Sequence, residues 1–148
     1  IVMERGDMSL DQALQTLGGQ SGLLGLSGLS GDVRDLEQAA DEGHAQARLA
    51  LDVYVTSVRH YLGAYLVELG GVDVIAFAGG IGENGARIRA AVCEGLNELG
   101  IVLDPEANRA AQGEAAIHAP ESRAAIWVTP TNEESIVARQ TYQLLQQA

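Results

Sequence analysis

Glycines and polar residues that could carry chemistry gather in residues 78–85, where an apolar run leads into Ala-Gly-Gly-Ile-Gly-Glu-Asn-Gly. Glycines let a ligand approach the backbone closely, and a helix that begins there presents unpaired N–H groups and the positive end of its dipole. A nucleotide site is one interpretation of this pattern. A tight turn between a strand and a helix, with Asn84 as the helix N-cap, is an equally good one. This segment alone does not decide the function.

The same glycines also fit a dinucleotide fingerprint. Gly80, Gly82 and Gly85 satisfy G-x-G-x-x-G, and Asp104 follows about twenty residues later, as that fingerprint requires. However, Glu83 would place a carboxylate where the pyrophosphate should lie, and the second strand would be only about four residues long. A NAD-binding, Rossmann-like domain is therefore an alternative and not the favoured interpretation.

A second polar cluster is Ser-Gly-Asp-Val-Arg at residues 30–34. In one interpretation Ser30 or Asp32 caps a helix and Arg34 is a solvated residue of its first turn. In the other, Asp32 accepts a hydrogen bond from a ribose hydroxyl or a purine amine, while the planar guanidinium of Arg34 stacks on the base. The residues by themselves leave both open.

A third cluster, Thr-Asn-Glu-Glu-Ser at residues 131–135, lies where a strand ends and a helix begins. Thr131 and Glu134 have the spacing of a capping box, which would account for Glu134 without any other role. Glu133 is less constrained by such a box. A carboxylate at this junction, facing the glycines, could hold Mg²⁺ beside the phosphates of ATP.

Composition limits the class of protein and its partners. The 148 residues are 47% hydrophobic, enough for one folded domain over 1–148, and 20 acidic against 9 basic residues give a charge of −11 that disfavours nucleic acids and anionic membranes. The lone Cys93 excludes an intrachain disulfide and fits a reducing compartment, so we expect a cytoplasmic protein without a membrane span. The three histidines lack metal-ligand spacing.

The elements that must position these residues follow from apolar spacing and glycines. Helices are predicted at 10–17, 44–69, 86–99, 105–112 and 133–147, and Gly70 and Gly71 should end the second of them. Strands are predicted at 72–78, covered on both faces, at 101–103, and at 124–129. Residues 20–31 are interpreted as a buried or semi-buried loop. This alternation predicts an α/β layered domain, and the opening residues read as the middle of a longer chain.

Three motifs taken together resemble the C-terminal region of the acetate/propionate kinase family. They are residues 21–27 with 32–34, residues 77–84, and residues 130–134, in that family's order and spacing, and the similarity covers nearly the whole chain. The family has the duplicated actin/hexokinase/Hsp70-like (ribonuclease H-like) fold. It transfers the γ-phosphoryl group of ATP reversibly to acetate or a close homologue, with Mg²⁺. The resemblance implies that this chain is a C-terminal lobe, with a mixed sheet flanked by helices.

The resemblance also implies roles for individual residues. The nucleotide, ATP or ADP, would contact Asp32, Val33, Arg34, Gly80, Ile81, Gly82, Glu83 and Asn84, and Mg²⁺ would be held by Glu133. The family's catalytic and carboxylate-binding groups match nothing here, so we expect the chain to be inactive alone, and family members pair as homodimers through this lobe. A non-catalytic dimerisation module remains an alternative, and the choice among acetate, propionate and butyrate stays open.

Overall fold

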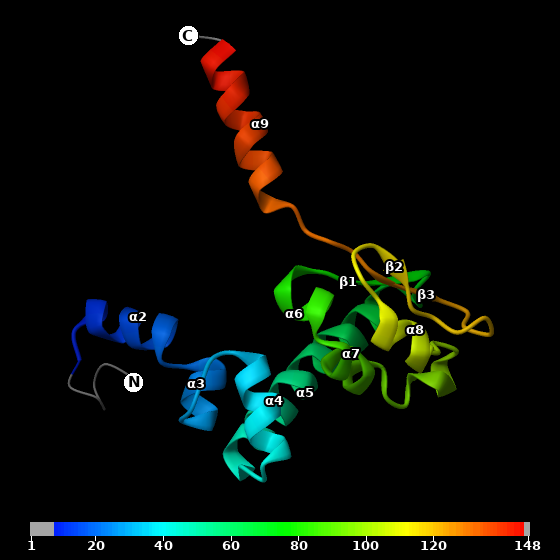
Figure 1. Cartoon of the computed structure of the whole chain (residues 1–148), viewed down its shortest axis with the longest axis horizontal. Helices are drawn as coiled ribbons and strands as arrows, with labels where there is room; N and C mark the ends of the chain where they lie inside the picture. The colour runs from blue at the N-terminus through cyan, green and yellow to red at the C-terminus, as the bar shows by residue number, and fades with distance from the viewer. Residues whose placement is uncertain (1–7, 147–148) are drawn as a thin grey trace. The chain divides into compact units, whose positions relative to one another are not determined.

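A computed structural model describes residues 8–146, apart from the side chain of Glu133 (Figure 1). Its contacts divide the chain into two compact units, Ile1–Glu68 and Leu69–Ala148. Each unit is described by itself below. The expectation of one domain over 1–148 stays a prediction.

The described part of the first unit is helical. Its elements are α2 (Leu10–Gly19), α3 (Gly22–Ser27), α4 (Val33–Asp41) and α5 (Ala45–Glu68). Leu36 and three alanines of α4 and α5 are buried together, because small side chains let these two helices approach closely. The predicted helix at 44–69 is confirmed, and Gly70 and Gly71 follow it with φ of +69° and +135°.

One prediction for this unit is wrong. Residues 20–31, interpreted as a buried or semi-buried loop, contain the helix α3, which ends where Gly28 adopts the left-handed conformation with φ of +64°. Within residues 22–27 only Ser27 is buried. The helix α3 has only 6 residues, and a helix this short shows no apolar periodicity in a segment rich in Leu, Gly and Ser.

The second unit contains a three-stranded mixed sheet. The strands lie in the order β1 (Val74–Phe77), β3 (Ala125–Val128) and β2 (Ala115–Ala116), with β1 parallel and β2 antiparallel to β3. Between β1 and β2 run α6 (Gly79–Asn84), α7 (Ala86–Cys93), the 3₁₀ helix η1 (Leu96–Leu99) and α8 (Pro105–Ala110), as Figure 1 shows. The predicted mixed α/β class is confirmed.

Three predictions for this unit need correction. The strand at 72–78 is shorter and is covered on one face only, since Ile75 is 8% exposed but Val74 is 54% exposed. The helix at 86–99 breaks at Gly95, whose φ of +73° separates α7 from η1. Residues 101–103 form no strand, because Leu103 makes only an isolated bridge to His118.

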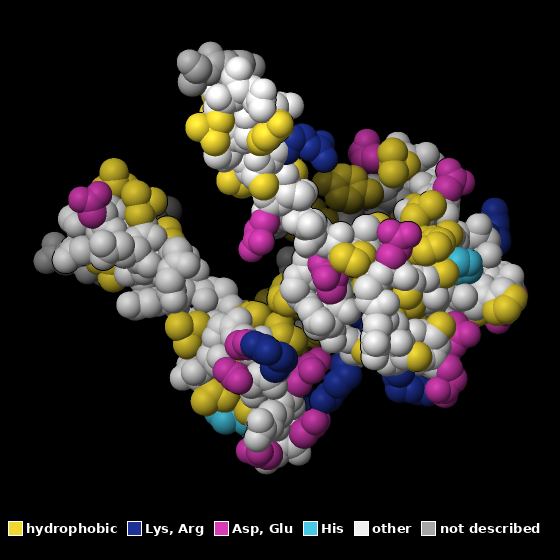
Figure 2. Space-filling view, turned by 45° about the horizontal axis from the view of Figure 1, so that its top comes forward, with side chains coloured by type: hydrophobic (Ala, Val, Ile, Leu, Met, Phe, Trp, Pro, Cys, Tyr) yellow, Lys and Arg dark blue, Asp and Glu magenta, His cyan; other side chains and the backbone are white. Residues whose placement is uncertain are grey.

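Helix α9 (Glu133–Gln146) confirms the predicted C-terminal helix up to residue 146, and Gln147 lies outside the described residues. Figure 2 shows hydrophobic side chains on its surface. Residues 134–146 are all exposed, including the apolar side chains of Ile136, Val137, Tyr142, Leu144 and Leu145. Among the helices of residues 8–146, none is long and apolar enough to cross a membrane.

Candidate functional site

The glycine-rich segment forms the short helix α6 rather than an open turn. Ala78 is its N-cap, with extended backbone and no side-chain cap, and Gly79 enters the helix with φ of +71°. The Nδ2 of Asn84 donates to the carbonyl oxygen of Gly80 at 2.9 Å. The alternative in which Asn84 caps the next helix is wrong, since Gly85 is the N-cap of α7.

Packing or backbone conformation requires three of the four glycines in this segment. A Cβ on Gly82 would lie 3.0 Å from the carbonyl carbon of Phe77, and one on Gly85 would lie 2.7 Å from the carbonyl oxygen of Ile81. Gly79 is required by its positive φ. Gly80 has none of these reasons, because a Cβ there would meet nothing within 4 Å. The absence of a side chain at Gly80 leaves space open beside the first turn of α6.

A buried arginine that the sequence analysis missed holds the end of α6. The side chain of Arg89 is 1% exposed, and its Nη1 donates to the carbonyl oxygens of Gly82 and Glu83, each at 2.8 Å. Its Nε donates to Oδ1 of Asn108 at 2.7 Å, and its Nη2 to the backbone oxygen of Asn108 at 2.8 Å. Burial lowers the pKa of Arg89. The sequence does carry a signal for this buried arginine, because Arg89 lies beside Ile88 on the apolar stripe of α7.

Glu83 joins two of the predicted site segments. Its Oε1 accepts hydrogen bonds from the backbone N–H of Thr131 at 2.8 Å and from the hydroxyl of Thr131 at 2.9 Å. These bonds lower the pKa of Glu83, because they stabilise the charged carboxylate. The segment of residues 80–84 is thereby tied to residues 130–134.

The start of α9 differs from the predicted capping box. Oδ1 of Asn132 accepts from the backbone N–H of Ser135 at 2.9 Å, so Asn132 makes the cap and the box of Thr131 with Glu134 is wrong. The helix begins at Glu133, which makes residue 132 and not residue 131 the N-cap, and the backbone N–H of Thr131 donates to Glu83. The side chain of Glu133 lies outside the described part of the structure, so its role as a Mg²⁺ ligand stays a prediction. Among the described residues, no three His, Cys, Asp or Glu side chains gather into a metal site.

In the first unit, Asp32 caps α4 and pairs with Arg34. Oδ1 of Asp32 accepts from the backbone N–H of Arg34 at 2.9 Å and from its Nε at 3.1 Å, while Oδ2 accepts from Nη2 at 2.6 Å. The side-chain bond to Arg34 is the main reason that the pKa of Asp32 falls to about 2. The predicted N-cap is confirmed, and Val33 between them is 6% exposed and belongs to the core. The Arg34 side chain is 86% exposed, so its planar face is open to solvent.

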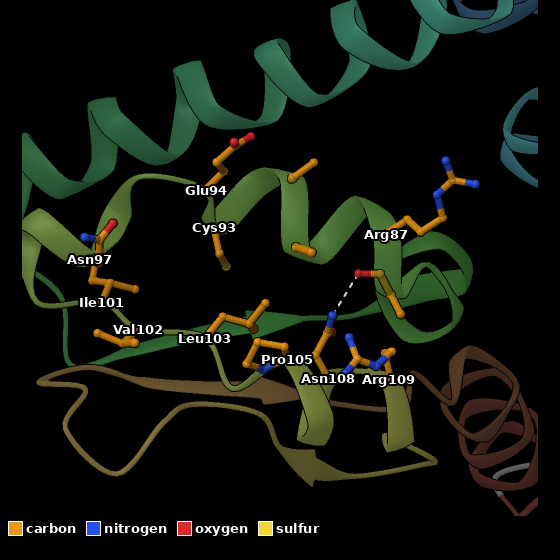
Figure 3. A pocket seen from close by; sticks show the side chains of 13 residues that line it. Arg87, Cys93, Glu94, Asn97, Ile101, Val102, Leu103, Pro105, Asn108 and Arg109 are labelled. Atoms are coloured by element: carbon orange, nitrogen blue, oxygen red, sulfur yellow. Dashed lines mark hydrogen bonds between the residues drawn. The ribbon is translucent and has the colours of Figure 1, made fainter. Parts of the chain in front are cut away.

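A pocket of about 550 Å³ lies elsewhere in the second unit, between α7, η1 and α8 (Figure 3). Its walls are largely apolar, and in Figure 3 the amide of Asn108 reaches the carbonyl oxygen of Ala86, at 2.8 Å. None of the residues predicted to bind a nucleotide or Mg²⁺ lines this pocket. The pocket is therefore separate from the predicted nucleotide and Mg²⁺ segments.

The dinucleotide alternative loses two of its features in the structure. Its second strand does not form, and Asp104 is the N-cap of α8. Oδ1 of Asp104 accepts from the backbone N–H groups of Glu106 at 2.8 Å and Ala107 at 3.0 Å. A carboxylate committed to a helix cap is a poor partner for a ribose.

Taken together, these features define part of a mixed α/β protein in which a short glycine-rich helix follows the first strand of the sheet. The model of the Acetokinase family matches residues 1–139. The chain belongs to this family, and the resemblance noted in its motifs is confirmed.

Individual relatives agree with this assignment. The chain is 44% identical over 145 residues to the acetate kinase of Dictyoglomus turgidum, covering 98% of this chain and 36% of that protein. The crystal structure of Porphyromonas gingivalis acetate kinase matches with a TM-score of 0.86 and 38% identity over 97% of this chain and 36% of that one. A propionate kinase from Francisella tularensis matches with a TM-score of 0.80 and 32% identity over 93% of this chain and 35% of that one. The chain thus spans about 36% of the length of the relatives it matches.

Proposed function

We propose that this chain is the nucleotide-binding part of an acetate kinase, which transfers the γ-phosphoryl group of ATP to acetate to give ADP and acetyl phosphate. The match to the Acetokinase family along residues 1–139 carries the proposal. On this view the chain is a C-terminal lobe of the actin/hexokinase/Hsp70-like type, and it acts in the cytoplasm. Acetate, or a short acyl homologue such as propionate, is the acceptor.

The space beside Gly80 supports a nucleotide contact at α6. Gly80 is the glycine in this helix that neither backbone conformation nor packing requires, and a side chain there would fill the space that an approaching ligand needs. In the proposal, Gly80, Ile81 and Asn84 lie near the adenine, with Gly82 and Glu83 completing the segment. Asp32, Val33 and Arg34 contact the adenosine, Val33 through its backbone because its side chain is buried, and Arg34 through the exposed face of its guanidinium.

Magnesium would be held by Glu133, and when bound it would neutralise charge on the phosphates of the nucleotide. The contribution of this chain is to bind and orient the nucleotide, which is most of what phosphoryl transfer needs from a protein. By the resemblance, the groups that hold acetate and the transferred phosphoryl group have no counterpart here. We therefore expect no turnover from this polypeptide alone, and acetate-dependent ADP formation in a coupled assay would contradict that expectation.

A pair of glycine substitutions tests the nucleotide site. Gly80→Ala should weaken ATP binding at least about ten-fold in calorimetry, because a methyl group would occupy the open space. The same change should leave the free energy of unfolding unchanged or raise it by about 0.5–1 kcal/mol, since alanine is favoured in helices. Gly82→Ala is the matched comparison and should destabilise the fold, because its Cβ would lie 3.0 Å from Phe77.

The outcomes separate cleanly. No binding of ATP to the unmodified chain would reject the proposed function. If the unmodified chain binds ATP and Gly80→Ala binds it with the same affinity, the nucleotide does not contact α6 at Gly80. Binding of NAD in place of ATP would restore the dinucleotide alternative.

We also propose that two copies of the chain pair through α5. Tyr61 and Tyr65 are each 62% exposed and lie four residues apart, so their side chains lie on the same side of the helix. Large exposed aromatic side chains placed side by side are typical of a protein interface. Light scattering should give a dimer mass for the chain and a monomer mass for Tyr61→Glu with Tyr65→Glu. Gln46→Glu, an added charge at another exposed position of α5, should remain dimeric.

A further inference from the structure

We propose that Glu83 is a positioning residue for the nucleotide segment, and that its contact with Thr131 holds α6 where nucleotide binding needs it. The inference rests on the proposed function of that segment. The carboxylate of Glu83 binds Thr131, and the neighbouring residues of α6 contact the nucleotide.

The contacts of Glu83 anchor α6 to two distant parts of the second unit. Its carbonyl oxygen accepts from Arg89, which also binds Asn108 in α8. Its carboxylate accepts both hydrogen bonds of Thr131, a residue 48 positions further along the chain. One residue therefore connects α6 to the α7 and α8 helices through its backbone, and to the segment before α9 through its side chain.

The segment that contains Thr131 is itself fixed to the sheet. The backbone N–H of Thr129 donates to the carbonyl oxygen of Phe77 at 2.9 Å, directly after the paired residues Phe77 and Val128. Gly82 of α6 lies so close to Phe77 that a Cβ on this glycine would be 3.0 Å from the carbonyl carbon of Phe77. The Glu83–Thr131 contact thus holds α6 against the segment that follows β3, while Phe77 at the end of β1 holds it from the other direction. Without this contact, α6 should become more mobile.

Charge gives a second reason for the contact. A free carboxylate in a segment that contacts ATP would repel the phosphates of the ligand whenever it turned toward them. The two donors of Thr131 stabilise the charge of Glu83 in place. An acidic residue among the glycines is therefore compatible with a nucleotide contact when its carboxylate is bound in this way.

The test measures ATP binding, without metal, by calorimetry on the 148-residue chain and its variants. Thr131→Val keeps the side-chain shape and removes the hydroxyl donor, and it should weaken ATP binding about ten-fold, as expected for a lost hydrogen bond to a charged group. Thr131→Ser keeps the hydroxyl and should bind within about two-fold of the unmodified chain. Glu83→Gln keeps an acceptor oxygen and should lose about three-fold, since hydrogen bonds to a neutral acceptor are weaker.

A control and a reciprocal measurement complete the design. Glu106→Gln is the control: it removes an exposed carboxylate in α8 that pairs with Arg109. This change should leave ATP binding unchanged. If ATP prefers the state in which Glu83 holds Thr131, saturating ATP must slow hydrogen exchange of the Thr131 amide by a factor comparable to the affinity lost in Thr131→Val. A role confined to general stability would not produce that match.

Each outcome supports or overturns the inference. Equal ATP affinity for Thr131→Val and the unmodified chain would overturn it and leave the proposed function intact. Equal losses for Thr131→Val and Thr131→Ser would overturn it as well, because the hydroxyl would then be irrelevant. If Thr131→Val does not fold, full affinity in Glu83→Ala would be the contradicting result. No ATP binding by the unmodified chain would reject the proposed function and this inference together.

Discussion

Replacing the buried Arg89 by methionine should destabilise the second unit substantially. Arg89 is 1% exposed, and its guanidinium donates to four oxygen atoms, two on Asn108 in buried surroundings and those of Gly82 and Glu83 in partly buried ones. Each buried acceptor left without a donor costs about 1–3 kcal/mol. Methionine fills part of the volume and removes a charge that is costly to bury. The expected net loss in the free energy of unfolding is about 3 kcal/mol.

Fluorescence of the single tryptophan, Trp127, offers a direct assay, because this residue lies on β3 in the same unit. Urea unfolding followed at this residue should show a lower midpoint for Arg89→Met, with an intermediate value for Arg89→Lys, whose ammonium cannot reach all four oxygen atoms. Arg109→Met, at a side chain 61% exposed, should change stability by no more than about 0.5 kcal/mol. A loss below about 1 kcal/mol for Arg89→Met would refute the reasoning.

Two further predictions concern other parts of the chain. The pKa of Asp32, lowered from 3.8 to about 2, means that its stabilising contribution is present above pH 4 and is lost as the pH falls through 2. In an NMR titration Arg34→Ala should move the Asp32 midpoint back toward 3.8, and an unchanged midpoint would exclude Arg34 as the cause. Gly100→Ala should lower the free energy of unfolding by at least about 1–2 kcal/mol, because φ is +76° and a Cβ would lie 2.5 Å from Cδ of Arg123. Gly113→Ala, with φ of +63° and no atom within 4 Å, should show only the conformational cost, and an equal loss at both glycines would contradict the role of Arg123.

The secondary structure that sequence patterns predicted well is long or clearly bounded. Helix α5 repeats its apolar spacing over 24 residues, and β3 is a continuous apolar run. The patterns failed for α3, with 6 residues, and for β2, with 2, because such short elements do not complete a period. They also joined α7 to η1, since a single glycine can interrupt a helix or be tolerated within it.

The sequence by itself determined the family, because three motifs occur in a recognisable order and spacing. It also determined the acidic net charge and the main helices and strands. Only the tertiary structure decided which glycine of α6 is not required by packing, where the carboxylate of Glu83 goes, and that Arg89 is buried. The reason is distance along the chain. Arg89 and Asn108 are 19 residues apart, and Glu83 and Thr131 are 48 apart, whereas sequence patterns report neighbours within about one or two helical turns.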